Sequence, residues 1–361
     1  MEEASDKPLR RGWTTGACAT AATRAAYGAL LTGAFEDPVT ITLPKGQTPA
    51  FALAREALGA DYALAGIVKD AGDDPDVTHG AMVISTVRRA APGSGVVFKA
   101  GAGVGTVTKA GLPLPVGEPA INPAPRAMIS DAVAALAAAQ GDSGDIEVEI
   151  SIPGGEALAA KTWNPRLGIE GGLSVLGTTG VVVPYSCSAW IHSIHRGIDV
   201  ARANGHDHVA GCTGSTSEKA VQALYGLPDG AMLDMGDFAG GLLKYLRRHP
   251  LPRLTLGGGF AKISKLAAGH LDLHSGRSQV DFEALAERCS SLGAGSPLSE
   301  QVRSARTAKQ ALEIACQAGL PLADATAQAA RQTALGVLAG ETTVEVLIVD
   351  RQGNLVGRAG D

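Results

Sequence analysis

Aromatic residues are scarce in this chain, since six Phe, five Tyr and three Trp make up only 4% of its 361 residues. No apolar run reaches the roughly 18 residues that a membrane-spanning helix needs, and residues 1–13 lack the apolar stretch of a signal peptide. The chain has no basic excess either, because its net charge is −5. These absences argue against membrane, secreted and nucleic-acid-binding proteins, and they predict a cytoplasmic location.

Cysteine is also infrequent, and its positions form no CxxC pair and no zinc-type spacing. The odd number of five favours reduced thiols in a cytoplasmic protein over a disulfide framework. The sequence therefore predicts no metal centre built on cysteine. The five cysteines are Cys18, Cys187, Cys212, Cys289 and Cys316.

The composition that remains is that of a folded protein, with 45% hydrophobic and 19% charged residues. At roughly 150 residues per domain, the length predicts two domains. The pattern of elements changes near 163–172, so we expect an α+β substrate-side domain over residues 1–165. A Rossmann-like α/β domain is expected over residues 166–361.

The first domain is predicted to open with an alanine-rich helix, "TTGACATAATRAAYGALLTG", capped by Thr14 or Thr15. Prolines 113, 115, 119, 123 and 125 favour extended backbone and are expected to exclude a helix before residue 130. A helix over 130–140 follows. Strands are expected at 38–44, 50–57, 81–90 and 146–153, and the segment 62–69 leads into an acidic loop.

The second domain reads as four strand-loop-helix units, beginning at Leu173. Strands that alternate with helices of this length predict a doubly wound, mostly parallel sheet. Helices between residues 282 and 338 and a late strand over 343–350 are expected in addition. The four units span 173–205, 208–226, 231–249 and 253–269.

Glycine-rich loops end the four predicted strands: "GTTG", "GCTGSTS", "MGD" and "GGGF". In an open parallel sheet such loops lie along one edge, where ligands bind, although each loop alone could need glycine only for its turn. No loop matches GxGxxG or GxxxxGK[ST], which argues against a phosphate-binding NTPase loop. Asp234 lies where an acid would bind ribose hydroxyls, whereas Asp237 fits a helix N-cap equally well.

A second cluster of polar residues lies in "KDAGDDPDVTHG", where Asp70, Asp73, Asp74 and Asp76 precede His79. Several carboxylates near one histidine suggest acid–base chemistry or a hard metal ion. A solvated acidic loop is the alternative, and the commoner one. Basic residues beside the glycine-rich turns of the first domain, including Lys69, Lys109 and Arg126, could bind a polycarboxylate substrate or be ordinary surface charge.

Five long motifs resemble the CbiD family, the cobalt-precorrin-5B C1-methyltransferases of cobalamin biosynthesis. They are "RRGWTTGACATAA", "KDAGDDPDVTHG", "TKAGLPLPVGEPAINPAPRAMI", "TWNPRLGIEGGLSVLGTTGVVVPYS" and "GCTGSTSEKAV". The resemblance implies methyl transfer from S-adenosylmethionine to ring carbon C-1 of a contracted corrin precursor. The products would be a precursor of the cobalt-precorrin-6A type and S-adenosylhomocysteine.

Joining the resemblance to the residue patterns above gives a hypothesis for the role of each candidate. Thr178 and Thr179 would bind the methionine carboxylate, and the macrocycle would lie between the domains against Lys69, Lys109 and Arg126. Asp70, His79 and Thr15 are the catalytic candidates. The adenosyl donor is expected on Gly177, Thr178, Thr179, Gly180, Gly211, Thr213, Gly214, Ser215, Asp234, Gly257 and Gly258.

Two other functions share these features. A nicotinamide-dependent reductase could use the same loops and Asp234, although the missing GxGxxG counts against it. A non-catalytic corrinoid-binding protein would bind the tetrapyrrole without any adenosyl ligand. The sequence leaves open whether the substrate carries cobalt and whether the chain forms a homo-oligomer.

Overall fold

The computed structural model describes residues 8–360, and contacts divide the chain into two compact units, 1–186 and 187–361. The division falls later than the predicted boundary near 163–172. The reason is that residues 169–182 form three short strand pairs within the first unit. These are β11 (Ile169–Glu170) with β9 (Thr106–Val107), β12 (Gly172–Leu173) with β8 (Gly103–Val104), and β13 (Val181–Val182) with β1 (Gly12–Trp13).

The first unit is built on a five-stranded sheet in the order β4-β5-β6-β10-β7. Neighbouring strands run antiparallel, except that β10 and β7 are parallel. The predicted strand over 38–44 is reduced to a two-residue pair, β2 (Val39–Thr40) with β3 (Ala50–Phe51). The sheet strands are β4 (Arg55–Leu58), β5 (Tyr62–Val68), β6 (Met82–Arg89), β7 (Val96–Ala100) and β10 (Ile146–Ser151).

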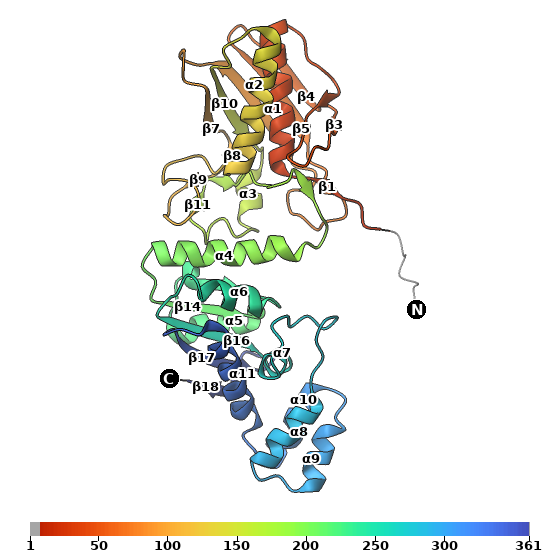
Figure 1. Cartoon of the computed structure of the whole chain (residues 1–361), viewed down its shortest axis with the longest axis vertical. Coiled ribbons are helices and arrows are strands. Elements are labelled where there is room, and N and C mark those ends of the chain that lie inside the picture. Colours follow the sequence, from red (N-terminus) through yellow and green to blue (C-terminus); the bar gives the residue numbers. More distant parts are fainter. Residues whose placement is uncertain (1–7, 361) are drawn as a thin grey trace. The chain divides into compact units, whose positions relative to one another are not determined.

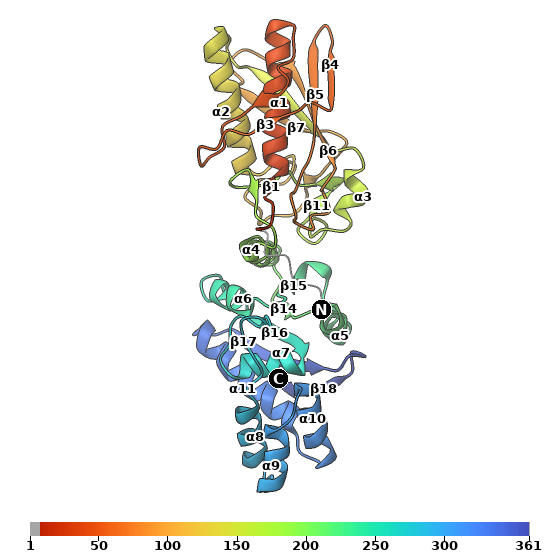
Figure 2. The ribbon, with the colours of Figure 1, turned by 90° about the vertical axis from the view of Figure 1, so that its right-hand side faces the viewer.

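Helices α1 (Thr15–Thr32) and α2 (Pro123–Gln140) lie side by side, and α1 packs on β5 and β6 (Figures 1 and 2). The buried face of α1 is mostly alanine, which allows a close approach to the sheet. Its N-cap is Thr14, whose hydroxyl accepts from the Ala17 N–H at 3.2 Å. A five-residue helix, α3 (Gly155–Ala159), follows β10.

The start of α2 corrects the expectation that prolines exclude a helix before residue 130. The helix begins at Pro123, with Pro125 also in its first turn. The first N–H groups of a helix have no intrahelical partner, so proline loses nothing there, and its fixed φ suits the helix.

The second unit contains the predicted parallel sheet, in the order β15-β14-β16-β17-β18. All neighbours are parallel except β17 and β18. Three of the four predicted strand-loop-helix units are confirmed, and the late strand joins this sheet beside β16. The strands are β14 (His208–Cys212), β15 (Met232–Asp234), β16 (Arg253–Gly259), β17 (Thr343–Val349) and β18 (Leu355–Ala359).

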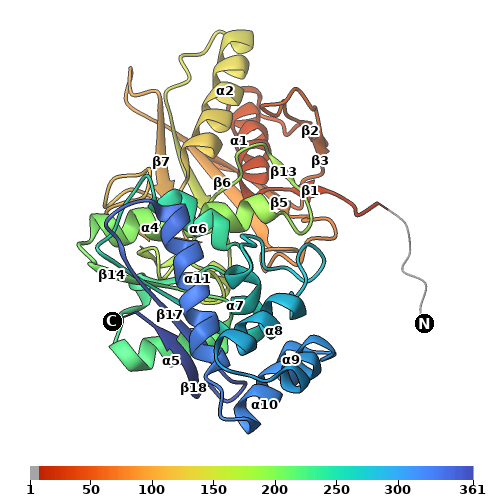
Figure 3. The same cartoon turned by 60° about the horizontal axis from the view of Figure 1, so that its bottom comes forward.

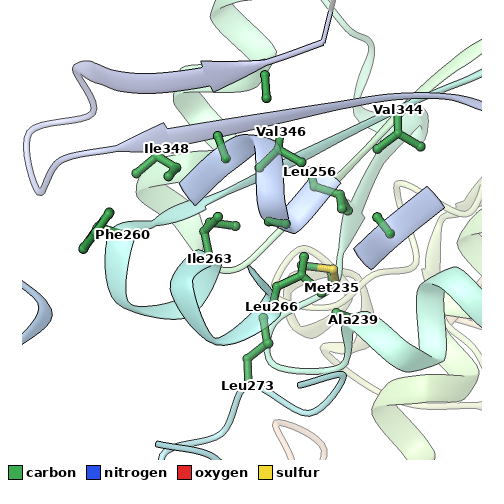
Figure 4. Close-up of a cluster of buried hydrophobic side chains, with 14 of the residues drawn as sticks. Met235, Ala239, Leu256, Phe260, Ile263, Leu266, Leu273, Val344, Val346 and Ile348 are labelled. Atoms are coloured by element: carbon green, nitrogen blue, oxygen red, sulfur yellow. The ribbon is translucent and has the colours of Figure 1, made fainter. Parts of the chain in front are cut away.

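Helices cover both faces of this sheet. Alternate residues of β17, namely Val344, Val346 and Ile348, face the larger core beneath α4, α6, α7 and α11 (Figure 4). Leu347 points the other way and packs with Val221 of α5. Figure 3 shows α11 beside α7. The helices are α4 (Cys187–Ala203), α5 (Ser215–Tyr225), α6 (Ala239–Leu246), α7 (Phe260–Ala267) and α11 (Leu322–Leu338), with a 3₁₀ turn at Asp229–Ala231.

Three further helices lie between α7 and α11 in the chain: α8 (Phe282–Ser291), α9 (Ser296–Arg303) and α10 (Ala308–Gln317). Their apolar faces share the larger core, with Leu285, Val302 and Ala311 buried in it. Among the described helices, none combines the length and apolar character that crossing a bilayer requires.

Candidate functional site

A pocket of about 310 Å³ lies at the carboxyl ends of β14 and β15. The chain leaves β14 toward β15 through α5 on one face of the sheet, whereas it leaves β16 toward β17, in the opposite direction, through α7 on the other face. The connections therefore diverge between β14 and β16, and such a switch point is where doubly wound sheets bind ligands. The volume is within the range of small-molecule sites, roughly 300–1,000 Å³. Its lining is Trp190, Thr213, Gly214, Ser215, Asp234, Gly236, Asp237, Phe238 and Lys262.

The loop after β14 supplies three of the predicted cofactor residues. Thr213 is buried, and its N–H donates to Gly257 O at 2.9 Å. Gly214 has an extended backbone, with φ 168° and ψ 170°, and a Cβ built on it would have no heavy atom within 4 Å. Neither backbone conformation nor protein packing requires glycine there. Ser215 begins α5, whose N-terminus has no side-chain cap and can offer N–H groups to a ligand.

Asp234 at the end of β15, Phe238 in the loop that follows it and Trp190 of α4 form another side of the pocket. Asp234 is the last residue of β15, and its carbonyl accepts from Trp190 Nε1–H at 2.9 Å. The rings of Trp190 and Phe238 lie 6.3 Å apart, and a Cβ at Gly236 would come within 3.3 Å of the Trp190 ring. This wall is suited to contact with a flat heterocycle.

Lys262 of α7 connects two of these loops. Its Nζ donates to Thr213 O at 3.0 Å and lies 2.9 Å from Asp237 Oδ1. Asp237 is not a helix N-cap, because α6 begins at Ala239 and its N-cap is Phe238. The N-cap interpretation of Asp237 is therefore wrong, and its carboxylate faces the pocket with Lys262.

Three other predicted cofactor glycines are explained by packing within the sheet and do not line the pocket. A Cβ at Gly211 would lie 2.9 Å from Leu242. One at Gly257 would lie 2.7 Å from Val221, and one at Gly258 would lie 2.9 Å from both Ile263 and Thr213. Their role is to let helices approach the strands closely.

The "GTTG" segment, Gly177–Gly180, does not end a strand of the parallel sheet, so that prediction is wrong. It belongs to the first unit and holds the N-terminus of α1, where Thr14 N–H donates to Gly180 O and Gly16 N–H donates to Leu176 O, both at 3.0 Å. Gly177 has φ +127°, and a Cβ built on it would lie only 2.2 Å from the Thr14 side chain. Thr178 and Thr179 lie in the same turn.

The acidic loop of the first unit is held by internal contacts. Arg10 forms a two-pronged ion pair with Asp70, and this hydrogen bonding lowers the Asp70 pKa to about 2. Asp74 accepts from Tyr185 N–H at 2.8 Å. Within residues 8–360, no three His, Cys, Asp or Glu side chains come together as a metal site. The geometry argues against Asp70 as a general base at neutral pH.

The other two catalytic candidates have different surroundings. His79 Nδ1 accepts from Ala71 N–H at 3.1 Å, which places the proton of a neutral ring on Nε2. Half of the His79 side chain is exposed. Thr15 is the first residue of α1 and is buried. It does not cap the helix, because the N-cap is Thr14.

The three basic candidates differ in whether their charged groups already have partners within the protein. Lys69 is buried and ion-paired to Asp76, which argues against contact with a substrate. Arg126 donates to Ile121 O at 2.8 Å and pairs with Glu118 at 2.9 Å, so its guanidinium fixes a loop. Lys109 has no hydrogen bond or ion pair to the described part of the chain, and its stem packs on Gly168.

Sequence reasoning missed Trp190, Phe238 and Lys262 in the pocket. Trp190 belongs to the helix before the sheet, and no local pattern links it to a strand end. Lys262 could have been found, because it lies one turn into the helix that follows the "GGG" loop of β16.

Comparison with known proteins gives consistent matches along the chain. The CbiD family model matches residues 2–184, and the model of the CbiD C-terminal domain matches residues 272–360. A cobalt-precorrin-5B C(1)-methyltransferase of Paramagnetospirillum magneticum is 62% identical over 357 residues, covering 99% of both chains. One of Brucella canis is 62% identical over 351 residues, covering 97% of this chain and 95% of the relative.

A crystal structure of a cobalamin biosynthesis protein (cbiD) from Archaeoglobus fulgidus has 26% sequence identity and a TM-score of 0.41. It covers 74% of this chain and 83% of that one. The first family model ends at residue 184, beside the end of the first compact unit at Ser186. With a family model over half of the chain and 62% identity over nearly all of it, this chain belongs to the CbiD family.

Proposed function

We propose that this chain methylates ring carbon C-1 of cobalt-precorrin-5B in cobalamin biosynthesis, with S-adenosylmethionine as the methyl donor. The product is of the cobalt-precorrin-6A type. The names of the relatives support the reaction. The five cysteines form no disulfide in the described part of the chain, which supports a reducing, cytoplasmic compartment.

The pocket of the second unit fits the adenosyl donor. Asp234 ends the strand next to the "GCTGS" loop, where an acid can accept hydrogen bonds from ribose hydroxyls. Gly214 leaves open space for the close approach of a ligand to the backbone. Trp190 and Phe238 provide an aromatic surface for adenine.

The donor supplies an already electrophilic methyl group, so the protein needs no covalent intermediate. The pocket residues have to fix its orientation and exclude water. Holding two reactants in line contributes on the order of 7–11 kcal/mol to lowering the barrier. Cys212 is buried in β14 and packs under α5, which suits a structural role.

The first unit supplies the candidates for the polycarboxylate macrocycle. Lys109 is the strongest of the three basic candidates, because its ammonium is not committed to a described partner. His79 presents Nε2–H as a donor, and Thr15 remains a further candidate. Asp70 is assigned instead to holding the acidic loop through Arg10.

The observation that carries this proposal is the pocket at the β14–β16 switch point with Asp234 at its wall. The test is calorimetric titration of the full chain with S-adenosylhomocysteine and, separately, with NADPH. We expect the chain to bind S-adenosylhomocysteine but not NADPH. Asp234→Asn should weaken this binding and also lower the rate of methyl transfer. Asp207→Asn is the control, since Asp207 is exposed at the opposite end of β14. Binding of NADPH alone would favour a reductase.

A further inference from the structure

The ion pair between Lys262 and Asp237 is only partly satisfied by the protein. An ammonium has three N–H donors, and Lys262 directs one of them to Thr213 O at 3.0 Å. Its Nζ also lies 2.9 Å from Asp237 Oδ1, where the two groups form an ion pair without a hydrogen bond. Asp237 Oδ1 is buried, and no described residue gives it a hydrogen bond.

Both groups line the same pocket as Asp234 and Trp190. An unsatisfied buried acceptor is unfavourable unless a ligand or water completes it. A ligand that carries a cation next to an anion would satisfy both residues at once. The α-ammonium and α-carboxylate of an amino acid are such a pair, because they are attached to one carbon.

We propose that Lys262 and Asp237 bind the amino-acid end of the methyl donor, with Lys262 donating to its carboxylate and Asp237 accepting from its ammonium. This inference rests on the proposed function. It replaces Thr178 and Thr179, which lie in the first unit, as the partners of the methionine carboxylate. Asp234 and the aromatic wall are then left for the nucleoside.

The experiment compares two ligands that differ only in the part assigned to this pair. S-adenosylhomocysteine carries the amino-acid end, whereas 5′-methylthioadenosine has the same nucleoside thioether without it. The affinities of both are measured by calorimetry on the full chain, as wild type and as Lys262→Met and Asp237→Asn. The matched control is Lys309→Met, which removes a lysine paired with a carboxylate on α10, outside the pocket.

A charged hydrogen bond lost from a ligand weakens binding by about tenfold or more. We therefore expect each pocket variant to weaken S-adenosylhomocysteine by that factor and to leave 5′-methylthioadenosine unchanged, which also shows that the variant is folded. Equal weakening of both ligands would mean that Lys262 only fixes the Thr213 loop, and no weakening would also overturn the inference. If wild type binds neither ligand, the proposed function itself fails.

Discussion

Replacing Gly214 with alanine separates ligand binding from folding. The backbone of Gly214 is extended, a conformation that alanine adopts, and the added Cβ would have no protein atom within 4 Å. The folded state is therefore not strained. Loss of glycine flexibility in the unfolded chain should even stabilise the protein by about 0.4–1 kcal/mol.

Binding should respond in the opposite direction, because the new methyl group occupies space at the pocket wall. Overpacking a fitted site costs about 1–3 kcal/mol, which corresponds to roughly 5- to 150-fold weaker binding. Gly257→Ala is the converse case, since its Cβ would lie 2.7 Å from Val221 and 3.0 Å from Cys212 Sγ. It should destabilise the fold by about 1–3 kcal/mol.

The assay pairs urea unfolding with calorimetric titration of S-adenosylhomocysteine. Gly336→Ala is the control, because Gly336 lies in α11 with open space around its Cβ. It should raise stability by about 1 kcal/mol and leave binding unchanged. Wild-type affinity in Gly214→Ala would show that no ligand approaches this wall. A marked loss of stability in Gly214→Ala would refute the conclusion that the folded protein has room for a Cβ at this position.

Two further predictions concern charged groups outside the pocket. In the folded protein the pKa of Asp70 is about 2, below its ordinary value of 3.8. The ionised Asp70 carboxylate therefore stabilises the fold fully above about pH 4, and this contribution is lost as pH falls toward 2. Asp70→Asn should flatten the acid limb of a pH–stability curve while costing at most about 1 kcal/mol at pH 7; an unchanged acid limb would contradict this. Glu345 is fully buried and paired with Arg358 at 2.7 Å. Glu345→Gln removes the counter-charge of Arg358, whose side chain is 43% exposed, and replaces a buried carboxylate acceptor with an amide. It should lower the free energy of unfolding by about 1–3 kcal/mol in urea unfolding, whereas a loss within error would mean that the network carries no net stability.

The sequence predicted those parts of the fold in which local pattern and tertiary structure agree. Strands such as β14 and β16 are apolar, end in glycine loops and precede amphipathic helices, so the parallel sheet and Asp234 at its edge could be predicted. The apolar run at 173–176 has the same local appearance. In the structure it forms only a two-residue pair with β8 of the first unit. No local sequence pattern indicates that this run pairs there and not in the parallel sheet.

Side-chain partners were the least predictable part of the site. Whether Lys69 or Lys109 is available to a substrate depends on the neighbours that folding brings, here Asp76 for Lys69. Trp190 reaches the pocket through a hydrogen bond to the carbonyl of Asp234, 44 positions along the chain. Contacts of this kind follow from the tertiary fold and leave no periodic signal.

The place of β17 in the sheet has a consequence for how the molecule is made. Although the C-terminal family model covers residues 272–360, β17 is hydrogen-bonded to β16 on one side and to β18 on the other. β17 is thus an interior strand of the sheet in the second unit, so the segment that this family model matches cannot act as a detachable module. During synthesis, β16 therefore stays without this neighbour until residues 343–349 have emerged from the ribosome.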